Sequence, residues 1–491
     1  MKSPSLLAVL ISSVLLSLIA AGTRADSQTP ATAQPETQAA VSHSSTASQQ
    51  LPIVFVQAPV IAADGLPNRF PQGSRIVRTA GGPQASNVVN LTPEFFAAAD
   101  TQVSFDASRV LFAAQSQSGG RWQIWEMRAD GFAKRQVTHL DADCFRPFYL
   151  AHEEFAFTVL ASKVERGASQ VYVAKLDGTE AHPITFGPGN FQVETVLKDG
   201  RILVSAGSPL VPGTADSGEL YVLRHDGTGL QSLRCEHGHP ARRAQASELA
   251  DGSIVFVKNP PTSAAVGGEL AMIRRGALHN SSLSPQAAVS WSPRPLEANK
   301  LIVARSNAPN ARPRFDLYAF DATSGKFGGP IYQDPKLSSV QASPVAARAV
   351  PRWYWSTLNP QAKAGYFVCL DARQSADEPD GRIATPLARV RVLILEGNKE
   401  RLLGFAHVEA DGSFYIAVPP DQPVRFELLD ANGAVVRAQR SWIWARPGEE
   451  RGCVGCHEDK SVAPENRWPL ALKRFDTPTR LGVEPDLKAA H

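Results

Sequence analysis

Short runs of β-branched and aromatic residues recur along the middle of the chain at nearly even intervals. Each run has three apolar residues and ends 45 to 57 residues after the one before it; the runs are 53–55, 110–112, 155–157, 202–204, 254–256 and 301–303. Side chains of this kind pack well on a pleated, half-buried surface, so the runs favour strands over helices. The spacing therefore predicts six copies of one β-unit.

A second strand and a tight turn follow most of these runs. Asp130-Gly131, Asp177-Gly178 and Asp226-Gly227 each come shortly after an apolar segment, and successive turns are 47 and 49 residues apart. Asp-Gly between apolar runs is a strong hairpin signal because the turn requires positive φ. Degenerate copies of the turn follow at Arg275-Gly276 and at Asp321. The strands before these five turns are 123–127, 171–173, 220–222, 270–272 and 317–319.

An all-strand repeat of about 40 to 50 residues is typical of the blades of a β-propeller. Six copies predict a six-bladed β-propeller over residues 51–345. The chief alternative is a large β-sandwich, but a sandwich does not keep a fixed period over six copies. The text of residues 104–112 and 127–138 resembles the TolB-like family of periplasmic propellers, which implies a binding or docking scaffold rather than a particular reaction.

A different strand pattern begins after a connector rich in proline, alanine and arginine, which we place at residues 346–364. Short apolar segments then alternate with turns such as Asp411-Gly412 and Asn432-Gly433; the segments are 366–368, 390–395, 414–418 and 424–429. This pattern predicts a small β-sandwich of transthyretin-like or immunoglobulin-like shape over residues 365–445. The predicted fold class is all-β: a six-bladed β-propeller, then this sandwich, then a C-terminal tail at 446–491.

The N-terminal region has a different character. Residues 1–25 combine a lysine near the start with an apolar run at 6–21 and small residues after it, which is the pattern of a secretory signal peptide cleaved between Ala21 and Ala25. Residues 26–50 contain no large apolar side chain except one valine, which predicts a disordered tether. We therefore expect an exported protein, periplasmic or secreted, with no transmembrane span after signal removal. An uncleaved N-terminal anchor is the alternative.

Composition adds two limits. The chain has 491 residues, enough for two or three domains with cores of their own. Charged residues make up 20% and the formal net charge is +3, which argues against nucleic-acid binding and against a polybasic membrane patch. Composition does not specify an oligomeric state.

One motif near the C-terminus carries chemistry. Cys453-Val454-Gly455-Cys456-His457 is the CxxCH signature of covalent c-type haem attachment. The two thiols can add across the two vinyl groups of one porphyrin, and the histidine is then held beneath the iron as its proximal ligand. Such attachment takes place outside the bacterial cytoplasm, so the motif and the signal peptide support each other. We predict one covalent haem c, with thioethers at Cys453 and Cys456 and His457 as the axial iron ligand.

A CxxC half of a zinc site is the main alternative. Zinc needs four N or S ligands, and the sequence has no second CxxC or HxxxH pair to complete the site. The other cysteines are Cys144, Cys235 and Cys369, which permit at most one disulfide and one free thiol. We expect them to be small buried hydrophobic side chains rather than a disulfide framework.

The sixth ligand of the iron is open. No methionine follows Cys456, and only Met127 and Met272 are present after the leader, so a standard His/Met cytochrome fold is not expected. Water, an open position or a histidine are the alternatives; the candidate histidines are His237, His239, His407 and His491. A metal site at Cys235, His237 and His239 is disfavoured, because donors so close on a strand alternate in direction.

Three tryptophans flank the motif, and two roles are open for them. Trp442, Trp444 and Trp468 either pack against the porphyrin and exclude water, or fill the core of the sandwich. Trp442 and Trp444 share a face if their segment is a strand.

The C-terminal part of the chain also carries a family resemblance. Asp411-Gly412-Ser413-Phe414 is followed by Arg440-Ser441-Trp442, and then by Pro447-Gly448-Glu449 before Cys-Val-Gly-Cys-His-Glu. This text resembles the family related to the hydrazine synthase alpha subunit, over the propeller and everything after it, about 430 residues. The stretch from Pro-Gly-Glu to Cys-His-Glu is its specific part.

The resemblance implies a propeller middle domain joined to c-type haem domains, in an enzyme that makes an N–N bond at one of its haems. This sequence has one CxxCH, so we expect the catalytic N-terminal haem domain of that family to have no counterpart here. What carries over is covalent haem binding at Cys453, Cys456 and His457.

The favoured hypothesis is a periplasmic monohaem c-type cytochrome-like protein that transfers single electrons, with the propeller docking a redox partner protein. One alternative is a haem enzyme with an open iron site acting on small nitrogen or oxygen species, and another is a binding or assembly module with a structural haem. The sequence contains no Gly-rich phosphate loop, no GxSxG elbow and no HExxH motif, so it identifies no catalytic residues.

Overall fold

The computed structural model describes thirteen stretches of the chain. They are 51–62, 65–79, 88–161, 169–207, 218–233, 241–260, 266–277, 280–283, 289–307, 313–397, 399–439, 441–456 and 465–483. All of them belong to one compact unit, Gln49–His491. The expected signal peptide and tether lie outside the described residues. Among the described residues, no helix has the length and apolar character needed to cross a membrane.

Residues from Ile53 to Pro344 form six four-stranded antiparallel sheets. Only one short helix, α1 (Gly65–Asn68), interrupts their strands in the described parts of this region. The first sheet contains β24 (Ser338–Pro344), β1 (Ile53–Ala58), β2 (Arg75–Thr79) and β3 (Val88–Asn90). The second contains β4 (Ala97–Val103), β5 (Arg109–Gln115), β6 (Trp122–Arg128) and β7 (Arg135–Gln136).

The other four sheets each use four consecutive strands. They are β8 (Ala142–Tyr149), β9 (Glu154–Ala161), β10 (Ser169–Lys175) and β11 (His182–Pro183); β12 (Phe191–Val196), β13 (Ile202–Gly207), β14 (Gly218–Leu223) and β15 (Gln231–Ser232); β16 (Arg242–Glu248), β17 (Ile254–Asn259), β18 (Glu269–Ile273) and β19 (Asn280–Ser282); and β20 (Val289–Glu297), β21 (Lys300–Ser306), β22 (Asp316–Asp321) and β23 (Lys326–Tyr332). We number the six sheets as blades 1 to 6 in this order.

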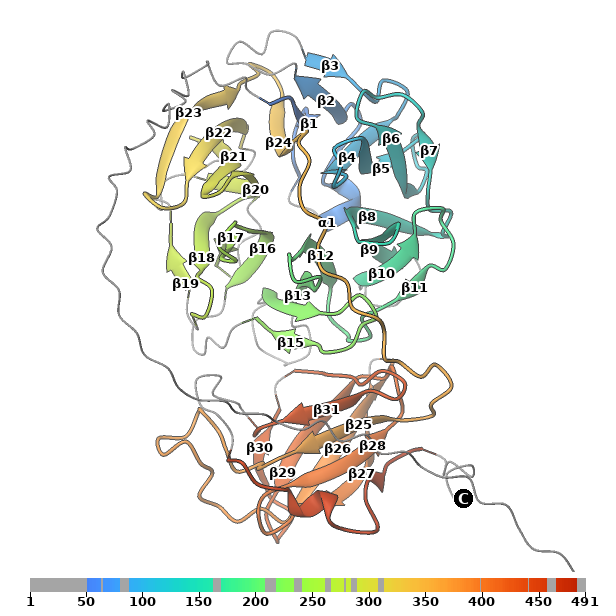
Figure 1. The fold of residues 1–491 in the computed structure, drawn as a ribbon, viewed down its shortest axis with the longest axis vertical. Helices are drawn as coiled ribbons and strands as arrows, with labels where there is room; N and C mark the ends of the chain where they lie inside the picture. Colours follow the sequence, from blue (N-terminus) through green and yellow to red (C-terminus); the bar gives the residue numbers. More distant parts are fainter. Residues whose placement is uncertain are drawn as a thin grey trace, which may run out of the picture. The chain divides into compact units, whose positions relative to one another are not determined.

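The six blades form a closed ring (Figure 1). The innermost strands β24, β4, β8, β12, β16 and β20 each contact the next, and β20 contacts β24. Blade 1 joins the two ends of the repeat, since β24 pairs with β1. This arrangement leaves no long open sheet edge, as in a β-propeller. The predicted all-β propeller is confirmed.

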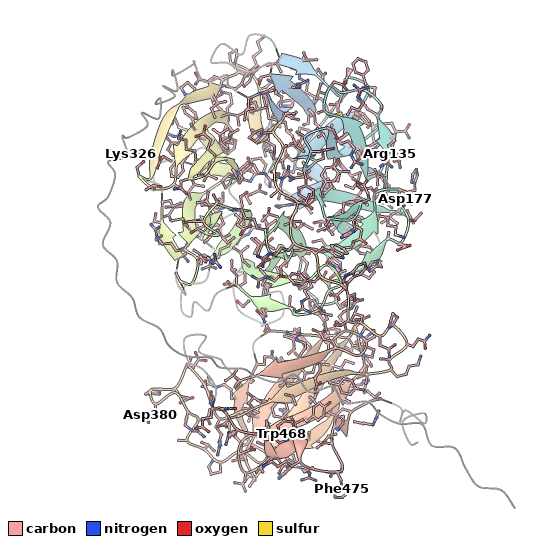
Figure 2. All side chains as sticks on the ribbon, in the orientation of Figure 1. Arg135, Asp177, Lys326, Asp380, Trp468 and Phe475 are labelled. Carbon is pink, nitrogen blue, oxygen red and sulfur yellow. The ribbon has the colours of Figure 1, made fainter. Side chains whose placement is uncertain are left out.

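The apolar repeat corresponds to fixed positions within each blade. The six predicted runs lie in β1, β5, β9, β13, β17 and β21, which are the second strands from the centre. The predicted turn at Asp321 joins the third and fourth strands of blade 6. The four predicted turns that contain a glycine join the same strands of blades 2 to 5, at the outer rim where Figure 2 labels Asp177. Their glycines have φ between +77° and +91°, as the Asp-Gly signal requires.

The innermost strands carry a feature that the apolar pattern does not predict. The pairing register of each innermost strand is interrupted, and the interruption begins at a polar residue. The six polar residues are Asp100, Arg146, Glu194, Gln245, Ser292 and Gln341. Five of the six, all except Glu194, have positive φ between 43° and 58°. This conformation costs a non-glycine residue on the order of 1–3 kcal/mol, so it persists only where the surrounding structure holds the residue in place. We call these six residues the bulge ring.

Hydrogen bonds between neighbouring blades hold the bulge ring in place. The backbone N–H of Arg146 donates to Asp100 (3.0 Å), and the Gln341 amide both donates to the Asp100 carboxylate (2.6 Å) and accepts from its N–H (2.9 Å). Gln341 N–H donates to Ser292 (2.8 Å), and Arg146 donates to Glu194 (2.6 Å). Similar bonds join blade 5 to its neighbours, from Ala246 N–H to Glu194 and from the Ser247 hydroxyl to the Pro293 carbonyl. The bulges therefore connect all six blades.

Residues from Gly365 to Arg480 form two further four-stranded sheets. One has the order β31-β25-β28-β32 and the other β27-β26-β29-β30; the strands are β25 (Gly365–Cys369), β26 (Arg389–Glu396), β27 (Lys399–His407), β28 (Phe414–Val418), β29 (Val424–Leu429), β30 (Val435–Ala438), β31 (Glu450–Cys453) and β32 (Thr479–Arg480). Phe367 and Ile416 from the first sheet share one buried core with Val390, Val392 and Leu428 from the second, as in a β-sandwich.

The C-terminal segment takes part in this sandwich. We expected residues 446–491 to form a separate tail, but β31 and β32 belong to the first sheet. Both pair in parallel with strands that precede them by many residues, β31 with β25 and β32 with β28. Parallel pairing over such a distance has no local turn signal, so the sequence pattern did not reveal it.

Candidate haem-attachment site

The CxxCH segment begins at the end of an edge strand. Cys453 is the last residue of β31, which has one neighbour, β25, and pairs with it so that Cys453 lies opposite Cys369. The side chains of Cys453 and Cys456 are half-buried against the sandwich core. His457, the predicted axial ligand, lies outside the described residues.

Three backbone hydrogen bonds fix the segment on the loop after β25. Leu370 N–H donates to the Cys453 carbonyl (2.8 Å), Asp371 N–H to the Val454 carbonyl (3.2 Å), and Cys456 N–H to the Gln374 carbonyl (3.0 Å). The two thiol-bearing residues therefore have defined positions.

Gly455 allows this close approach. A Cβ atom at Gly455 would lie 2.5 Å from the Gln374 carbonyl oxygen, which is closer than real Cβ contacts. The glycine of the motif is thus required by packing against the loop after β25, in addition to any role in cofactor attachment.

Burial keeps the thiols of Cys456 and Cys369 protonated. Burial raises the pKa of Cys456 to about 11, against a partial lowering by Arg437, and burial raises the pKa of Cys369 well above its usual value. None of the four described cysteines, Cys144, Cys369, Cys453 and Cys456, forms a disulfide, and Cys144 and Cys369 are buried as expected. Protonated thiols are poor metal ligands, because the thiolate is the form that binds metal. They suit addition to a vinyl group, in which an S–H bond is consumed.

The zinc alternative gains no support from the described residues, which contain no group of three His, Cys, Asp or Glu side chains that could hold a metal ion. The disfavoured site at Cys235, His237 and His239 lies outside them, as does His491. His407 is exposed at the end of β27, in the sheet that does not contain β31. Met127 and Met272 are buried in blades 2 and 5 of the propeller.

A cluster of arginines around one buried carboxylate lies beside the motif. The buried Asp371, whose N–H bonds to Val454, accepts hydrogen bonds from the guanidinium groups of Arg373 (2.8 Å), Arg382 (3.0 Å) and Arg467 (3.4 Å). Glu465 also pairs with Arg467 (3.5 Å), and the Asp411 carboxylate acts on both Arg373 and Arg467, so three guanidinium groups and three carboxylates form one network. Sequence reasoning missed it, because its members come from separate segments and form no motif.

One of the three tryptophans, Trp444, has neither of the two roles expected from the sequence. Trp444 is fully buried in the propeller core, where it packs edge-on against Phe186 (5.9 Å between ring centroids) and Phe191 (5.6 Å). It therefore neither fills the sandwich core nor shares a face with Trp442. Trp442 is buried on the sandwich, 5.6 Å from the Arg425 guanidinium, and Trp468 is 67% exposed (Figure 2).

Polar contacts secure the same segment to the propeller. The Glu449 carboxylate accepts from Gly229 N–H of blade 4 (2.8 Å) and from Arg446 N–H (2.8 Å). Arg446 also donates to the Pro183 carbonyl of blade 3 (3.1 Å). These contacts explain the sequence Pro447-Gly448-Glu449. The chain turns at Gly448, where φ is +75°, and this turn places Glu449 against blade 4.

Arg451 completes this attachment from within β31. It donates to the Leu230 carbonyl of blade 4 (2.6 Å) and to the Trp444 carbonyl. The side chains of Arg446, Glu449 and Arg451 thus bind blades 3 and 4, while the backbone of β31 and the motif is held by the sandwich.

The fold and this segment define a class: a six-bladed β-propeller joined to a β-sandwich that carries a CxxCH motif. A family model described as the hydrazine synthase alpha subunit middle domain matches residues 384–458. These residues are the sandwich from just before β26 through the motif, whereas the resemblance had led us to associate the middle domain with the propeller.

Known proteins show the same likeness over most of the chain. Hydrazine synthase subunit alpha of Kuenenia stuttgartiensis is 24% identical over a match that covers 82% of this chain and 65% of the relative. The solved structure of Kuenenia stuttgartiensis hydrazine synthase matches with a TM-score of 0.78 at 22% identity, covering 86% of this chain and 71% of that one. TolB of Acinetobacter baumannii gives a TM-score of 0.44 at 13% identity, covering 60% and 66%.

These comparisons confirm the resemblance to the hydrazine synthase alpha family and the shared fold. The chain spans slightly less than two thirds of the length of the curated relative.

Replacing Trp444 by alanine is expected to loosen the attachment of the C-terminal sheets to the propeller. Truncating a fully buried aromatic costs about 3–5 kcal/mol. We expect a lower thermal unfolding temperature and faster proteolysis within residues 346–364. Trp468→Ala is the matched control, because its exposed ring should leave both measurements at the wild-type level. Equal effects of the two substitutions would contradict the assignment.

Gly455→Ala is expected to displace the motif from Gln374. Overpacking of this kind costs about 1–3 kcal/mol, which thermal unfolding of the haem-free protein should detect. Gly452→Ala is the control, three residues earlier in β31, since a Cβ there meets nothing within 4 Å. The interpretation fails if Gly452→Ala destabilises the protein as much as Gly455→Ala.

Proposed function

We propose that this chain is an exported c-type haem protein that transfers single electrons. Cys453 and Cys456 form the thioether bonds, and His457 is the proximal ligand. The observation that carries the proposal is the CxxCH segment itself, anchored by three backbone hydrogen bonds with both thiols half-buried. The match of residues 384–458 to the hydrazine synthase alpha model supports it, because that match includes the whole motif.

The surrounding residues suit such a group. When bound, a haem supplies a reversible one-electron couple and carries two propionate carboxylates. Arg373, Arg382 and Arg467, which share Asp371 beside the motif, supply guanidinium donors that can pair with those carboxylates. The buried Asp371 orients the three guanidinium groups, as a supporting carboxylate does around other cofactors.

The setting of the protein follows from the same chemistry. Covalent attachment of this kind takes place outside the bacterial cytoplasm, and residues 1–25 have the pattern of a signal peptide. We therefore place the protein in the periplasm or outside the cell. The propeller is the surface we assign to docking a redox partner protein.

Attachment is tested by expressing the full chain with cytochrome c maturation machinery and weighing the purified protein by mass spectrometry. We expect the mass of one haem on the wild type, a reduced haem content after Cys453→Ser or Cys456→Ser, and none after both. Cys369→Ser is the control: it removes the neighbouring buried thiol and should leave the haem content unchanged. A wild-type protein without added mass would refute the proposal.

A second function is favoured by the comparisons. The relative that covers 82% of this chain is named hydrazine synthase subunit alpha, so an enzyme with an open iron position is the alternative. The described residues also include no methionine near the motif, since Met127 and Met272 lie in the propeller.

Carbon monoxide separates the two functions. For electron transfer we expect a low-spin absorbance spectrum of the reduced protein that CO leaves unchanged, together with a reversible one-electron couple. A high-spin spectrum that shifts on addition of CO would instead establish an exchangeable iron position and favour the enzyme.

A further inference from the structure

A cavity of about 150 Å³ lies within the propeller, between the segment that contains α1 and blades 3, 4, 5 and 6. Ala62 and Arg69 border it from the two sides of α1, and Trp291 borders it from blade 6. Its described lining includes four arginines, Arg69, Arg146, Arg242 and Arg243, and no aspartate or glutamate. The lining contains no residue of the sandwich, and the proposed function does not use this cavity.

Two of these arginines form ion pairs with carboxylates that do not line the cavity. Arg146 pairs with the buried Glu194 (2.6 Å), and Arg243 pairs with Glu219 (3.0 Å). Both carboxylates lie outside the lining of the cavity. The arginines therefore present their remaining N–H donors to the interior with their charge already partly balanced.

Arg69 is different. Its guanidinium lies 5.9 Å from the centre of the Trp291 ring, and within the described part of the chain it has no hydrogen-bond acceptor or ion-pair partner. Burial, reinforced by repulsion from Arg146, lowers the pKa of Arg69 to about 10, so it is still cationic at neutral pH. Arg69 thus lines the cavity as a cation with no directly bonded counterion, and the Asp100 and Glu194 carboxylates favour its charge only from a distance.

Two amides lie at the same wall. Gln245 is only 7% exposed, belongs to the bulge ring, and has no side-chain hydrogen bond to any described residue. Gln192 uses its carbonyl oxygen to accept from Arg146 (3.4 Å), which leaves its NH₂ group as a donor. A buried polar side chain without a partner usually indicates a missing ligand or water.

We propose that this cavity is a binding site for a small oxyanion, held by Arg69 with the amide groups of Gln192 and Gln245. The planar guanidinium can donate two parallel hydrogen bonds to a carboxylate or to a tetrahedral oxyanion. Such a ligand supplies the negative charge that Arg69 lacks and the acceptors that the amides lack. The volume restricts it to a molecule of a few non-hydrogen atoms.

The test uses the full chain and two probe anions, inorganic phosphate and malonate. Isothermal titration calorimetry and thermal unfolding are measured against sodium chloride at equal ionic strength. We expect saturable binding at one site per chain and a rise in unfolding temperature that chloride does not produce. Phosphate binding alone identifies an inorganic oxyanion site, and malonate binding alone identifies a carboxylate site; either result supports the proposal.

Arg69→Gln is the decisive variant. We expect it to raise the dissociation constant at least tenfold and, because it removes an unpaired charge, to leave the unfolding temperature of the ligand-free protein unchanged or higher. Arg401→Gln is the control, since this exposed arginine pairs with Glu396 on the sandwich and should bind the anion as the wild type does. Gln245→Met gives a second measurement if Arg69→Gln does not fold, with an expected loss of at least threefold.

The proposal is overturned if neither anion binds saturably to the wild type, or if chloride produces the same stabilisation. It is also overturned if the anions bind equally well to the wild type and to the folded variants at Arg69 or Gln245.

Discussion

The hydrogen-bonded bulge ring is the constraint on which the rest of the structure depends. Asp100 and Gln341 join blade 2 to blade 1, and Arg146 and Glu194 join blade 3 to blade 4. Five of its six members hold a backbone conformation that costs energy in isolation, so the network both requires the closed ring and stabilises it. By fixing blades 3 and 4 against each other, it creates the pocket for Trp444. The position of the CxxCH segment follows from that contact.

Much of the fold could be predicted from the sequence, because the second and third strands of each blade have local signals. The apolar runs lie in β1, β5, β9, β13, β17 and β21, and the predicted Asp-Gly turns lie where positive φ is needed. The innermost strands could not be predicted. Their bulges interrupt the alternation of apolar and polar residues, and β16, with the sequence RRAQASE, contains no run of large apolar side chains. Their identity as strands depends on neighbours in other blades.

In the candidate site, too, contiguous motifs could be predicted from the sequence, whereas contacts between residues far apart in the sequence could not. Cys453, Cys456 and His457 are recognisable because the motif is contiguous, although His457 lies beyond the described residues. The role of Trp444 could not be predicted, since Phe186 and Phe191 are more than 250 residues away in sequence. The same is true of Asp371 and Arg467, and of the cavity at Arg69. Each depends on segments that only the closed fold brings together.

Blade 1 has a consequence for how the molecule forms. In its innermost strand, β24, Val340 pairs with Val56 of β1. The first strand of the propeller therefore gains this neighbour only after the last strand has been synthesised. Contacts between residues so far apart in sequence are slow to form, because the chain loses much of its freedom before it gains them. During synthesis β1 therefore exposes an unpaired edge until residue 344 has emerged. A chaperone that shields this edge would protect the nascent chain from aggregation at its most vulnerable stage.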